Sequence, residues 1–320
     1  MSVEAYSPSA GRDRAVSVII PVFNNYEGIR ACLRALTRQT LNRELFEVIV
    51  VDNGSADDRH ALLESEFKDQ FCLRLVKESM RGSYAARNKG IREARGDILA
   101  FTDSDCSPES EWLESGMKAL QENPNCGFVG GEVEQAFESK DAPNAAEIHD
   151  QNYFQQERNI AEKKFTPTAN LFTRMDIMDR VGPFNADLFS GGDLEWCQRC
   201  ERRGLHGVYA SGARMKHKAR ATFQALLERD IRLLRGKFAL GSRGLDPSFA
   251  TTFTWIRCFR GLIPPVRFFY RSFFGEKKLT SLHLKLKFFA IGLGLRYALL
   301  FETVRLRIAY SFRRRSDGIK

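Results

Sequence analysis

The fold is decided at residues 96–106, where the sequence reads GDILAFTDSDC. Asp97–Phe101 is long enough for one buried strand, and the polar TDSD that follows predicts a loop at the end of that strand. The same arrangement occurs twice upstream, at Val16–Val22 (VSVIIPV) and Phe46–Val51 (FEVIVV), and Leu73–Val76 can form a further strand. The first half of the chain is therefore expected to supply several buried strands.

Segments with the spacing of amphipathic helices separate these strands, at Glu27–Gln39, Asp57–Phe67 and Ser83–Ala94. Regular alternation of strand and helix predicts an α/β fold, with a doubly wound, mostly parallel sheet and helices on both faces. After Gly130 the pattern loosens into mixed α and β, and beyond about residue 219 it becomes helical and basic.

Polar loops follow three of the predicted strands: PVFNN at 21–25, DNGS at 52–55 and TDSD at 102–105. In open α/β sheets, ligands bind beyond the carboxyl ends of the strands. We therefore expect these loops to meet at one edge of the sheet and to form a binding site there.

Asp103 and Asp105 are two carboxylates separated by one residue. On an extended turn both can bind one Mg²⁺ or Mn²⁺, because these cations take one or two carboxylates and complete their shell with phosphate oxygens and water. The structural alternative is an acidic turn before a helix near Glu109–Leu120, with Asp105 or Ser107 as its N-cap. The local pattern leaves both interpretations open.

Two further segments near the predicted edge can bind a nucleotide. Asp52 can accept a hydrogen bond from a nucleobase N–H or a ribose hydroxyl, although an Asx turn at Asn53-Gly54 explains it equally. Gly82–Asn88 opens a helix with small residues and Arg87, and a helix N-terminus offers free N–H groups to a phosphate. A well-started helix without a ligand is the alternative.

Asp193 follows two glycines in GGDLEW, residues 191–196, at the start of a predicted helix. A carboxylate there can act as a general base if an acceptor hydroxyl lies within hydrogen-bond reach, and a simple N-cap is the alternative. His217 can be a third metal ligand or a phosphate partner, whereas a lone histidine is more commonly structural.

Taken in order, five segments resemble glycosyltransferase family 2, whose inverting enzymes have the GT-A fold. From about residue 16 to 217 the resemblance covers about two thirds of the chain, and five segments in the family's order are more specific than any one alone. The segments are VSVIIPVFN at 16–24, VIVVDNGSADD at 48–58, GSYAARNKG at 82–90, GDILAFTDSDC at 96–106 and GGDLEWCQR at 191–199.

The resemblance implies a role for each matching residue. Asp105 would be the main metal ligand for Mn²⁺ or Mg²⁺, with Asp103 nearer the ribose or a metal-bound water and His217 near the diphosphate. Asp193 matches the aspartate of the family's "ED" element and would be the catalytic base; Gly192 replaces the preceding Glu and removes one acidic contact. The residues that would hold the donor are Pro21, Val22, Asn24, Asp52, Arg81, Arg87, Asp103 and Ser104.

The implied reaction moves a hexose from a nucleotide sugar, most commonly a UDP-sugar in this family, to a hydroxyl of a glycan or lipid-linked acceptor in polysaccharide biosynthesis. A nucleotidyltransferase is a rival, but it would need a Gly-rich, cationic loop where this chain has PVFNNYEG. A non-catalytic membrane-surface scaffold is the other rival. The intact acids at Asp52, Asp103, Asp105 and Asp193 argue against a scaffold.

Charge divides the chain unevenly. Residues 211–320 hold 24 Lys/Arg and 6 Asp/Glu, a net charge of +18, whereas residues 1–210 carry −9. Such a segment predicts an anionic partner. Aromatic residues and arginines alternate at Thr254–Phe274, and the apolar run Phe288–Leu295 is far shorter than the ~20 residues of a spanning helix. A basic helix at an anionic membrane surface is therefore expected, reinforced by Arg313–Arg315, with packing on the core as the alternative. Nucleic acid is not expected, because no binding motif accompanies the charge.

The sequence thus predicts a loose arm at 1–15, a GT-A catalytic domain at 16–220 and a basic, aromatic-rich helical region at 221–320. The arm lacks the apolar core of a secretory signal. Seven dispersed cysteines, including the lone pair Cys197 and Cys200, predict reduced thiols rather than a disulfide framework or a zinc site. A cytoplasmic protein, peripheral on the inner face of the cell membrane, is expected. The oligomeric state is left open.

Overall fold

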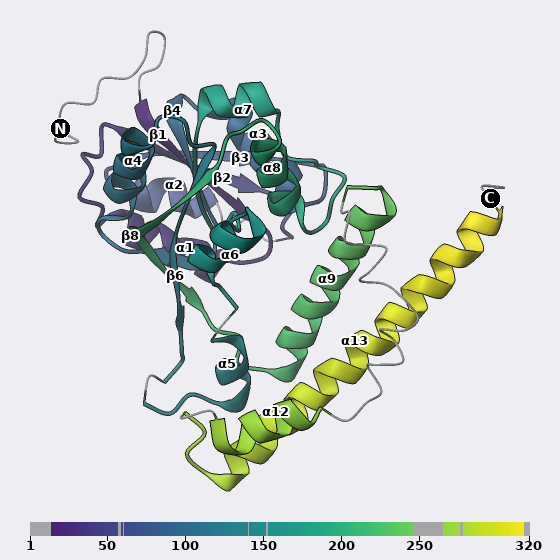
Figure 1. Ribbon diagram of the computed structural model, residues 1–320. Coiled ribbons are helices and arrows are strands. Elements are labelled where there is room, and N and C mark those ends of the chain that lie inside the picture. The colour runs from purple at the N-terminus through teal and green to yellow at the C-terminus, as the bar shows by residue number, and fades with distance from the viewer. Residues whose placement is uncertain are drawn as a thin grey trace. The chain divides into compact units, whose positions relative to one another are not determined.

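The computed structural model describes residues 14–56, 59, 61–139, 141–151, 153–245, 265–275 and 278–316, without the side chains of 61, 271 and 313–316. Most of the predicted arm, Asp57, Asp58, Cys258 and the aromatic and basic residues at 254–264 lie outside the described residues. The chain divides into two compact units, described separately here (Figure 1). The sheet unit comprises Met1–Glu134 and Phe154–Lys218, and the helical unit comprises Gln135–Tyr153 and Ala219–Lys320.

An eight-stranded sheet has the strand order β3-β2-β1-β4-β7-β6-β8-β5. β1 pairs in parallel with β2 and β4, and β2 pairs in parallel with β3, whereas β7 runs antiparallel to β4 and β6, and β5 runs antiparallel to β8. The predicted α/β, mostly parallel sheet is therefore confirmed. The strands are β1 (Arg14–Val22), β2 (Phe46–Asp52), β3 (Cys72–Lys77), β4 (Gly96–Thr102), β5 (Cys106–Pro108), β6 (Phe128–Ala136), β7 (Asn170–Arg174) and β8 (Gly207–Lys218).

Helices cover both faces of this sheet (Figure 1). Alternate residues of a strand point to opposite faces: Val18 packs in a core with α1, α2 and α4, whereas Phe101 faces Phe184 at a ring separation of 5.3 Å, next to α3 and α8. The helices of this unit are α1 (Tyr26–Leu36), α2 (Ala61–Phe67), α3 (Ser83–Glu93), α4 (Trp112–Glu122), α6 (Gln156–Lys163), α7 (Met175–Val181) and α8 (Gly192–Glu201).

The structure excludes one of the two alternatives for Asp103-Ser104-Asp105, the acidic turn that caps a helix. Cys106–Pro108 forms the short strand β5, and α4 begins only at Trp112, with Glu111 as the N-cap residue. Neither Asp105 nor Ser107 is therefore a helix cap, because pairing with β8 holds this segment extended. The structural explanation of the Asp103-Ser104-Asp105 sequence as a capping turn is thus wrong.

The helical unit contains α5 (Ala145–Asp150), α9 (Phe223–Ser242), α12 (Val266–Tyr270), the π-helical turn η3 (Arg271–Gly275) and α13 (Leu282–Ser316). α13 packs along α9 and α5. The ring of His149 on α5 stacks on Phe288 at 4.0 Å between centroids, and Glu302 on α13 accepts a hydrogen bond of 2.7 Å from Arg235 on α9. Within the described residues, no helix is both long and apolar enough to cross a membrane.

Candidate active site

The loops after β1 and β2 are joined at the carboxyl edge of the sheet. Val22 and Asp52 are paired at the ends of their strands, and the N–H of Asn53 donates to the Val22 carbonyl at 2.9 Å. The backbone N–H of Asn24 donates to Ser55 Oγ at 2.9 Å, and the N–H of Ser55 donates to Asp52 Oδ1 at 3.0 Å. Asp52 is thus held in an Asx-type turn, with its carboxylate at the edge where a ligand is expected.

Asn53 ties this edge to the start of α3. Its side-chain amide donates to the Met80 carbonyl at 2.7 Å, and its Oδ1 accepts from the Gly82 N–H at 2.8 Å. Gly82 has φ of 128°, a conformation that favours glycine. Next to it, the Arg81 guanidinium lies 4.3 Å from the ring centroid of Phe23. The Arg81 cation is therefore located beside the first two loops.

Asp103 and Ser104 each have a fixed partner. Arg87 on α3, only 3% exposed, forms a short ion pair with Asp103, whose side chain is 35% exposed. The side-chain amide of Asn25 donates to Ser104 Oγ at 3.0 Å. The loop after β4 is thereby fastened both to α3 and to the loop after β1.

Asp105 lies beside His217, because β5 and β8 pair Cys106 with His217. His217 Nε2 is 3.3 Å from Asp105 Oδ2, and one potential ligand atom from each of these three residues lies within 4.8 Å of the others. Burial, followed by the charges of Asp103 and Asp105, raises the pKa of the Cys106 thiol well above its ordinary value. The available donors are therefore a half-exposed carboxylate, an imidazole and a buried thiol whose raised pKa disfavours the thiolate.

Asp193 occupies a different environment from the other acids. It lies in the first turn of α8, which is capped by Gly191, and its Oδ1 accepts from the Leu194 N–H at 2.9 Å and from the Tyr84 hydroxyl at 3.1 Å. Burial raises the pKa of Asp193 above the ordinary carboxyl value. Because Gly191 is the N-cap residue, the simple N-cap explanation of Asp193 does not apply.

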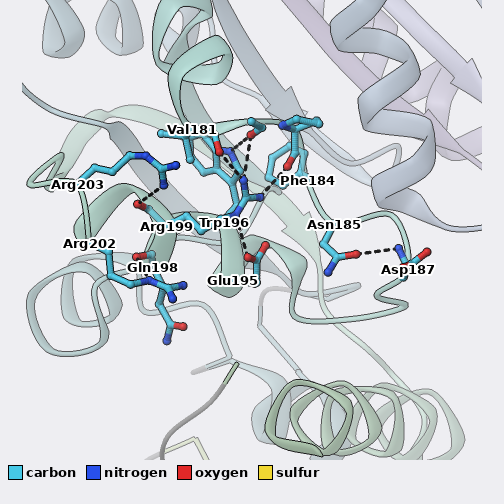
Figure 2. A network of polar contacts seen from close by, with 12 residues as sticks. Val181, Phe184, Asn185, Asp187, Glu195, Trp196, Gln198, Arg199, Arg202 and Arg203 are labelled. Atoms are coloured by element: carbon cyan, nitrogen blue, oxygen red, sulfur yellow. Dashed lines mark hydrogen bonds and ion pairs between the residues drawn. The ribbon is translucent and has the colours of Figure 1, made fainter. Parts of the chain in front are cut away.

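Arg199 anchors the helix that carries Asp193 (Figure 2). Its guanidinium donates to Glu195 Oε1 at 2.8 Å and to carbonyls within residues 181–183 at 2.6 and 2.7 Å. The indole N–H of Trp196 donates to a carbonyl of the same segment at 2.9 Å. The beginning of α8 is therefore held by a network of side-chain and backbone contacts.

Comparison with known proteins decides the family. Residues 17–184 match the family model of Glycosyl transferase family 2. Glycosyltransferase AglE of Haloferax volcanii is 40% identical over 225 residues, which cover 69% of this chain and 72% of AglE. The chain belongs to glycosyltransferase family 2. It is accordingly a nucleotide-sugar glycosyltransferase of an inverting family.

Solved structures confirm the GT-A fold of this family 2 member. The mannosyltransferase PcManGT from Pyrobaculum calidifontis, in complex with GDP-Man and Mn²⁺, matches with a TM-score of 0.61 at 19% identity, over 95% of this chain and 91% of that chain. Residues 1–349 of TarS from S. aureus, in complex with UDP-GlcNAc, match with a TM-score of 0.55 at 16% identity, over 94% and 92%. At these identities the likeness establishes the fold alone.

Most residues predicted for the family 2 site lie at one sheet edge or on the helices beside it. Three pairs are in direct contact: Arg87 with Asp103, Asp105 with His217, and Asn24 with the loop that follows Asp52. Pro21 and Val22 differ, because both are inside β1 and the Val22 side chain is 2% exposed in the core. Val22 offers its carbonyl to the neighbouring loop rather than its side chain to a ligand.

Tyr84, Asn25 and Asn53 have contacts that the sequence does not predict. Asn25 and Asn53 lie in the predicted site loops 21–25 and 52–55, but no individual role is predicted for either. Tyr84 lies inside the predicted helix start at 82–90. Its bond to Asp193 joins residues 109 positions apart, and no local pattern indicates that pairing.

Proposed function

We propose that this glycosyltransferase moves a hexose, with inversion, from a nucleotide sugar to a hydroxyl of a glycan or lipid-linked acceptor. Asp103 and Asp105 hold the donor and metal, and Asp193 is the general base. The observation that carries the proposal is the contrast between Asp105, half exposed beside His217, and Asp193, partly buried beside Tyr84 with a raised pKa. Proton transfer and cation binding require these two different environments.

The joined loops after β1 and β2 favour donor binding at this end of the site. Asp52 and the Asn24 loop suit a nucleoside, whose base N–H and ribose hydroxyls need acceptors. Arg81 and Arg87 supply positive charge for the phosphates, near the N-terminus of α3. UDP is the nucleotide that the family resemblance implies. The PcManGT and TarS structures are complexes with GDP-Man and UDP-GlcNAc, so both nucleotides belong in a test.

Asp105 and His217 would hold the metal, with Asp103 next to it. The carboxylates suit Mn²⁺ or Mg²⁺, and the protonated Cys106 thiol is a poor ligand for either. When bound, the cation supplies Lewis-acid stabilisation of the charge that develops on the leaving nucleoside diphosphate. Arg87 keeps Asp103 oriented through the ion pair between them.

Asp193 takes the proton from the acceptor hydroxyl as that oxygen attacks the anomeric carbon. The bond from the anomeric carbon to the diphosphate breaks on the opposite side, so one displacement inverts the centre without a covalent sugar–enzyme intermediate. A raised pKa suits this role, because a general base works best when its pKa lies near the working pH.

Thermal-shift measurements with UDP-, GDP- and dTDP-sugars, with and without Mn²⁺, test the donor assignment. Since ligands that bind only the folded state stabilise it, we expect one nucleotide class to raise the Tm by about 2–6 °C in a Mn²⁺-dependent way. Nucleotide release from that donor separates an enzyme from a scaffold. The absence of a shift with every donor would contradict the proposal, and pyrophosphate release from a nucleoside triphosphate would favour a nucleotidyltransferase.

We further propose that α13 attaches the protein to an anionic membrane surface. At about 100° per residue, six exposed apolar side chains of α13 fall within an arc of roughly 120°, and the buried Phe288, Leu295 and Glu302 lie on the opposite side. The six are Leu282, Leu286, Tyr297, Phe301, Ile308 and Phe312. The stripe therefore differs from the predicted apolar run 288–295, whose end residues face the core of the helical unit.

Basic residues flank this stripe on both sides. By the same helical spacing, Lys287 and Arg305 lie along one edge, and Lys285, Arg296 and Arg307 lie along the other. An apolar stripe between basic flanks is typical of helices that lie in the membrane interface, with the cations at anionic headgroups. The free cysteines of the described residues and this basic face favour the inner face of the cell membrane.

Co-sedimentation of the full chain with vesicles tests the membrane proposal. We expect pelleting with phosphatidylcholine vesicles containing about 30% phosphatidylglycerol, and little with phosphatidylcholine alone. Replacing Phe301 and Phe312 together by Ser should weaken binding about tenfold or more. Leu62→Ser, which removes a 57% exposed side chain of the sheet unit, is the matched control. Unchanged pelleting of the Phe301/Phe312 variant would contradict the assignment.

A further inference from the structure

The hydroxyl of Tyr84 is aimed at the carboxylate of Asp193. It donates to Asp193 Oδ1 at 3.1 Å, and the same oxygen accepts the Leu194 N–H at 2.9 Å. These two donors fix one carboxylate oxygen and thereby define the direction of the other. Tyr84 is 5% exposed, and its contact with Asp193 is partly buried.

Gly192 makes room for the Tyr84 ring. A Cβ atom at position 192 would lie 2.8–2.9 Å from three ring carbons, closer than any ordinary side-chain contact. The space that an acidic side chain at position 192 would occupy is filled by the Tyr84 ring, and the Tyr84 hydroxyl contacts the next residue, Asp193. Tyr84 and Gly192 fit each other as a pair.

Both helices that carry this contact are fastened to the same short segment. Asn88 on α3 exchanges two hydrogen bonds with the backbone of Phe184, at 2.7 and 3.0 Å. Arg199 and Trp196 on α8 bind carbonyls at 181–183 (Figure 2). The segment 181–184 therefore sets the distance between Tyr84 and Asp193.

Several groups face Asp193 from the surrounding elements: Tyr84 and Arg87 from α3, Leu194 N–H from α8, and the charge of Asp103 from the loop after β4. Burial, followed by the Asp193 charge, raises the pKa of Tyr84 well above its ordinary value. The hydroxyl therefore stays protonated and remains a donor throughout the working pH range.

We infer that Tyr84 is a positioning residue for the general base: its hydroxyl aims the Asp193 carboxylate at the acceptor hydroxyl, and Gly192 is required for that placement. This inference rests on the proposed role of Asp193. Tyr84 keeps its proton during the reaction, because the proton of the acceptor hydroxyl goes to the other oxygen of Asp193.

Tyr84→Phe tests the inference, because it keeps the ring against Gly192 and removes only the hydroxyl. We expect kcat to fall about tenfold to a hundredfold, the range for losing one hydrogen bond to a charged group, with the donor KM changed less than about twofold. The acidic limb of the kcat profile should move to higher pH, because the Tyr84 hydrogen bond lowers the pKa of Asp193. Gly192→Ala should lower kcat similarly by displacing the ring.

Tyr209→Phe is the matched control, since it also removes a tyrosine hydroxyl that donates to a carboxylate, that of Glu132. It should leave kcat and its pH profile unchanged. Wild-type kcat and pH profile in Tyr84→Phe would overturn the inference, provided that Asp193→Asn is inactive. An active Asp193→Asn would instead overturn the proposed base itself, which keeps the two failures distinguishable.

Discussion

The acids after β4 and the acid on α8 belong to one unit but have different partners and different exposure. Asp103 and Asp105 are about one third to one half exposed and each has a basic partner, Arg87 or His217. Asp193 is partly buried and accepts hydrogen bonds from two neutral donors, Tyr84 and Leu194. Exposure leaves a carboxylate open to a cation, whereas burial raises its affinity for a proton. Under the proposed roles, the surroundings of each carboxylate give identical side chains different chemistry.

Removing the acid on α8, Asp193, should have the largest effect. Asp193→Asn keeps an acceptor for Tyr84 and Leu194 but cannot take a proton, so we expect kcat to fall about 10³-fold. Transfer is measured by nucleotide release in the presence of the acceptor. Asp69→Asn, at an exposed position, is the control. Near-wild-type transfer by Asp193→Asn would show that Asp193 is not the base. The proposed difference in role between Asp193 and the acids after β4 would then no longer hold.

Removing the half-exposed acid should instead act on the metal. We expect Asp105→Asn to weaken Mn²⁺ binding at least about tenfold, because a carboxylate supplies the charge that a hard cation requires. Electron paramagnetic resonance of free Mn²⁺ in the presence of nucleotide gives the affinity directly. Unchanged Mn²⁺ affinity would place the metal away from Asp105 and His217.

The pH profile of kcat should report the titration of Asp193. Because burial raises the pKa of Asp193, its basic form is lost as pH falls through that raised value. The acidic limb of kcat should therefore lie above about pH 4, the ordinary range for aspartate. The control is the pH dependence of Mn²⁺-nucleotide binding. A kcat limb at the ordinary carboxyl pKa would contradict the assignment of Asp193 as the titrating base.

The smallest effect is expected on thermal stability, where Asp193→Asn should raise the Tm at high pH. A carboxyl whose pKa is raised on folding stabilises the fold below its unfolded pKa, and that contribution is lost as pH rises through the folded pKa. Asp193→Asn removes a charge that the partly buried site disfavours, so its Tm should exceed that of the wild type by roughly 2–4 °C at about pH 8. The gain should vanish near pH 4. A lower Tm at high pH would indicate that the charged form stabilises the fold.

The sequence predicted the sheet and its site edge better than it predicted contacts between helices. Val16–Val22 and Asp97–Phe101 are continuous apolar runs that end in polar residues, and such runs indicate buried parallel strands. Strand order in a parallel sheet brings their ends together, so Asp52 and Asp103 could be assigned to one edge. The pairing of Tyr84 with Asp193 depends on two helices separated by 109 residues.

In the helical unit, too, the sequence does not predict which residues are buried by neighbouring helices. The run Phe288–Leu295 was recognised as apolar, but its sequence does not reveal which side α9 and α5 cover. Only packing separates the buried Phe288 from exposed residues such as Phe301, which is 72% exposed. Long-range packing, rather than periodicity, decides which apolar residues of α13 remain available to a membrane.

Donor binding by calorimetry, compared between Asp193→Asn and Asp105→Asn, tests the central claim most directly. We predict that Asp193→Asn binds the nucleotide sugar and Mn²⁺ within about twofold of the wild-type Kd while transferring nothing. Asp105→Asn should lose at least about tenfold in Mn²⁺-dependent donor affinity. Loss of donor binding in Asp193→Asn, with binding retained in Asp105→Asn, would contradict the division between donor binding and proton transfer.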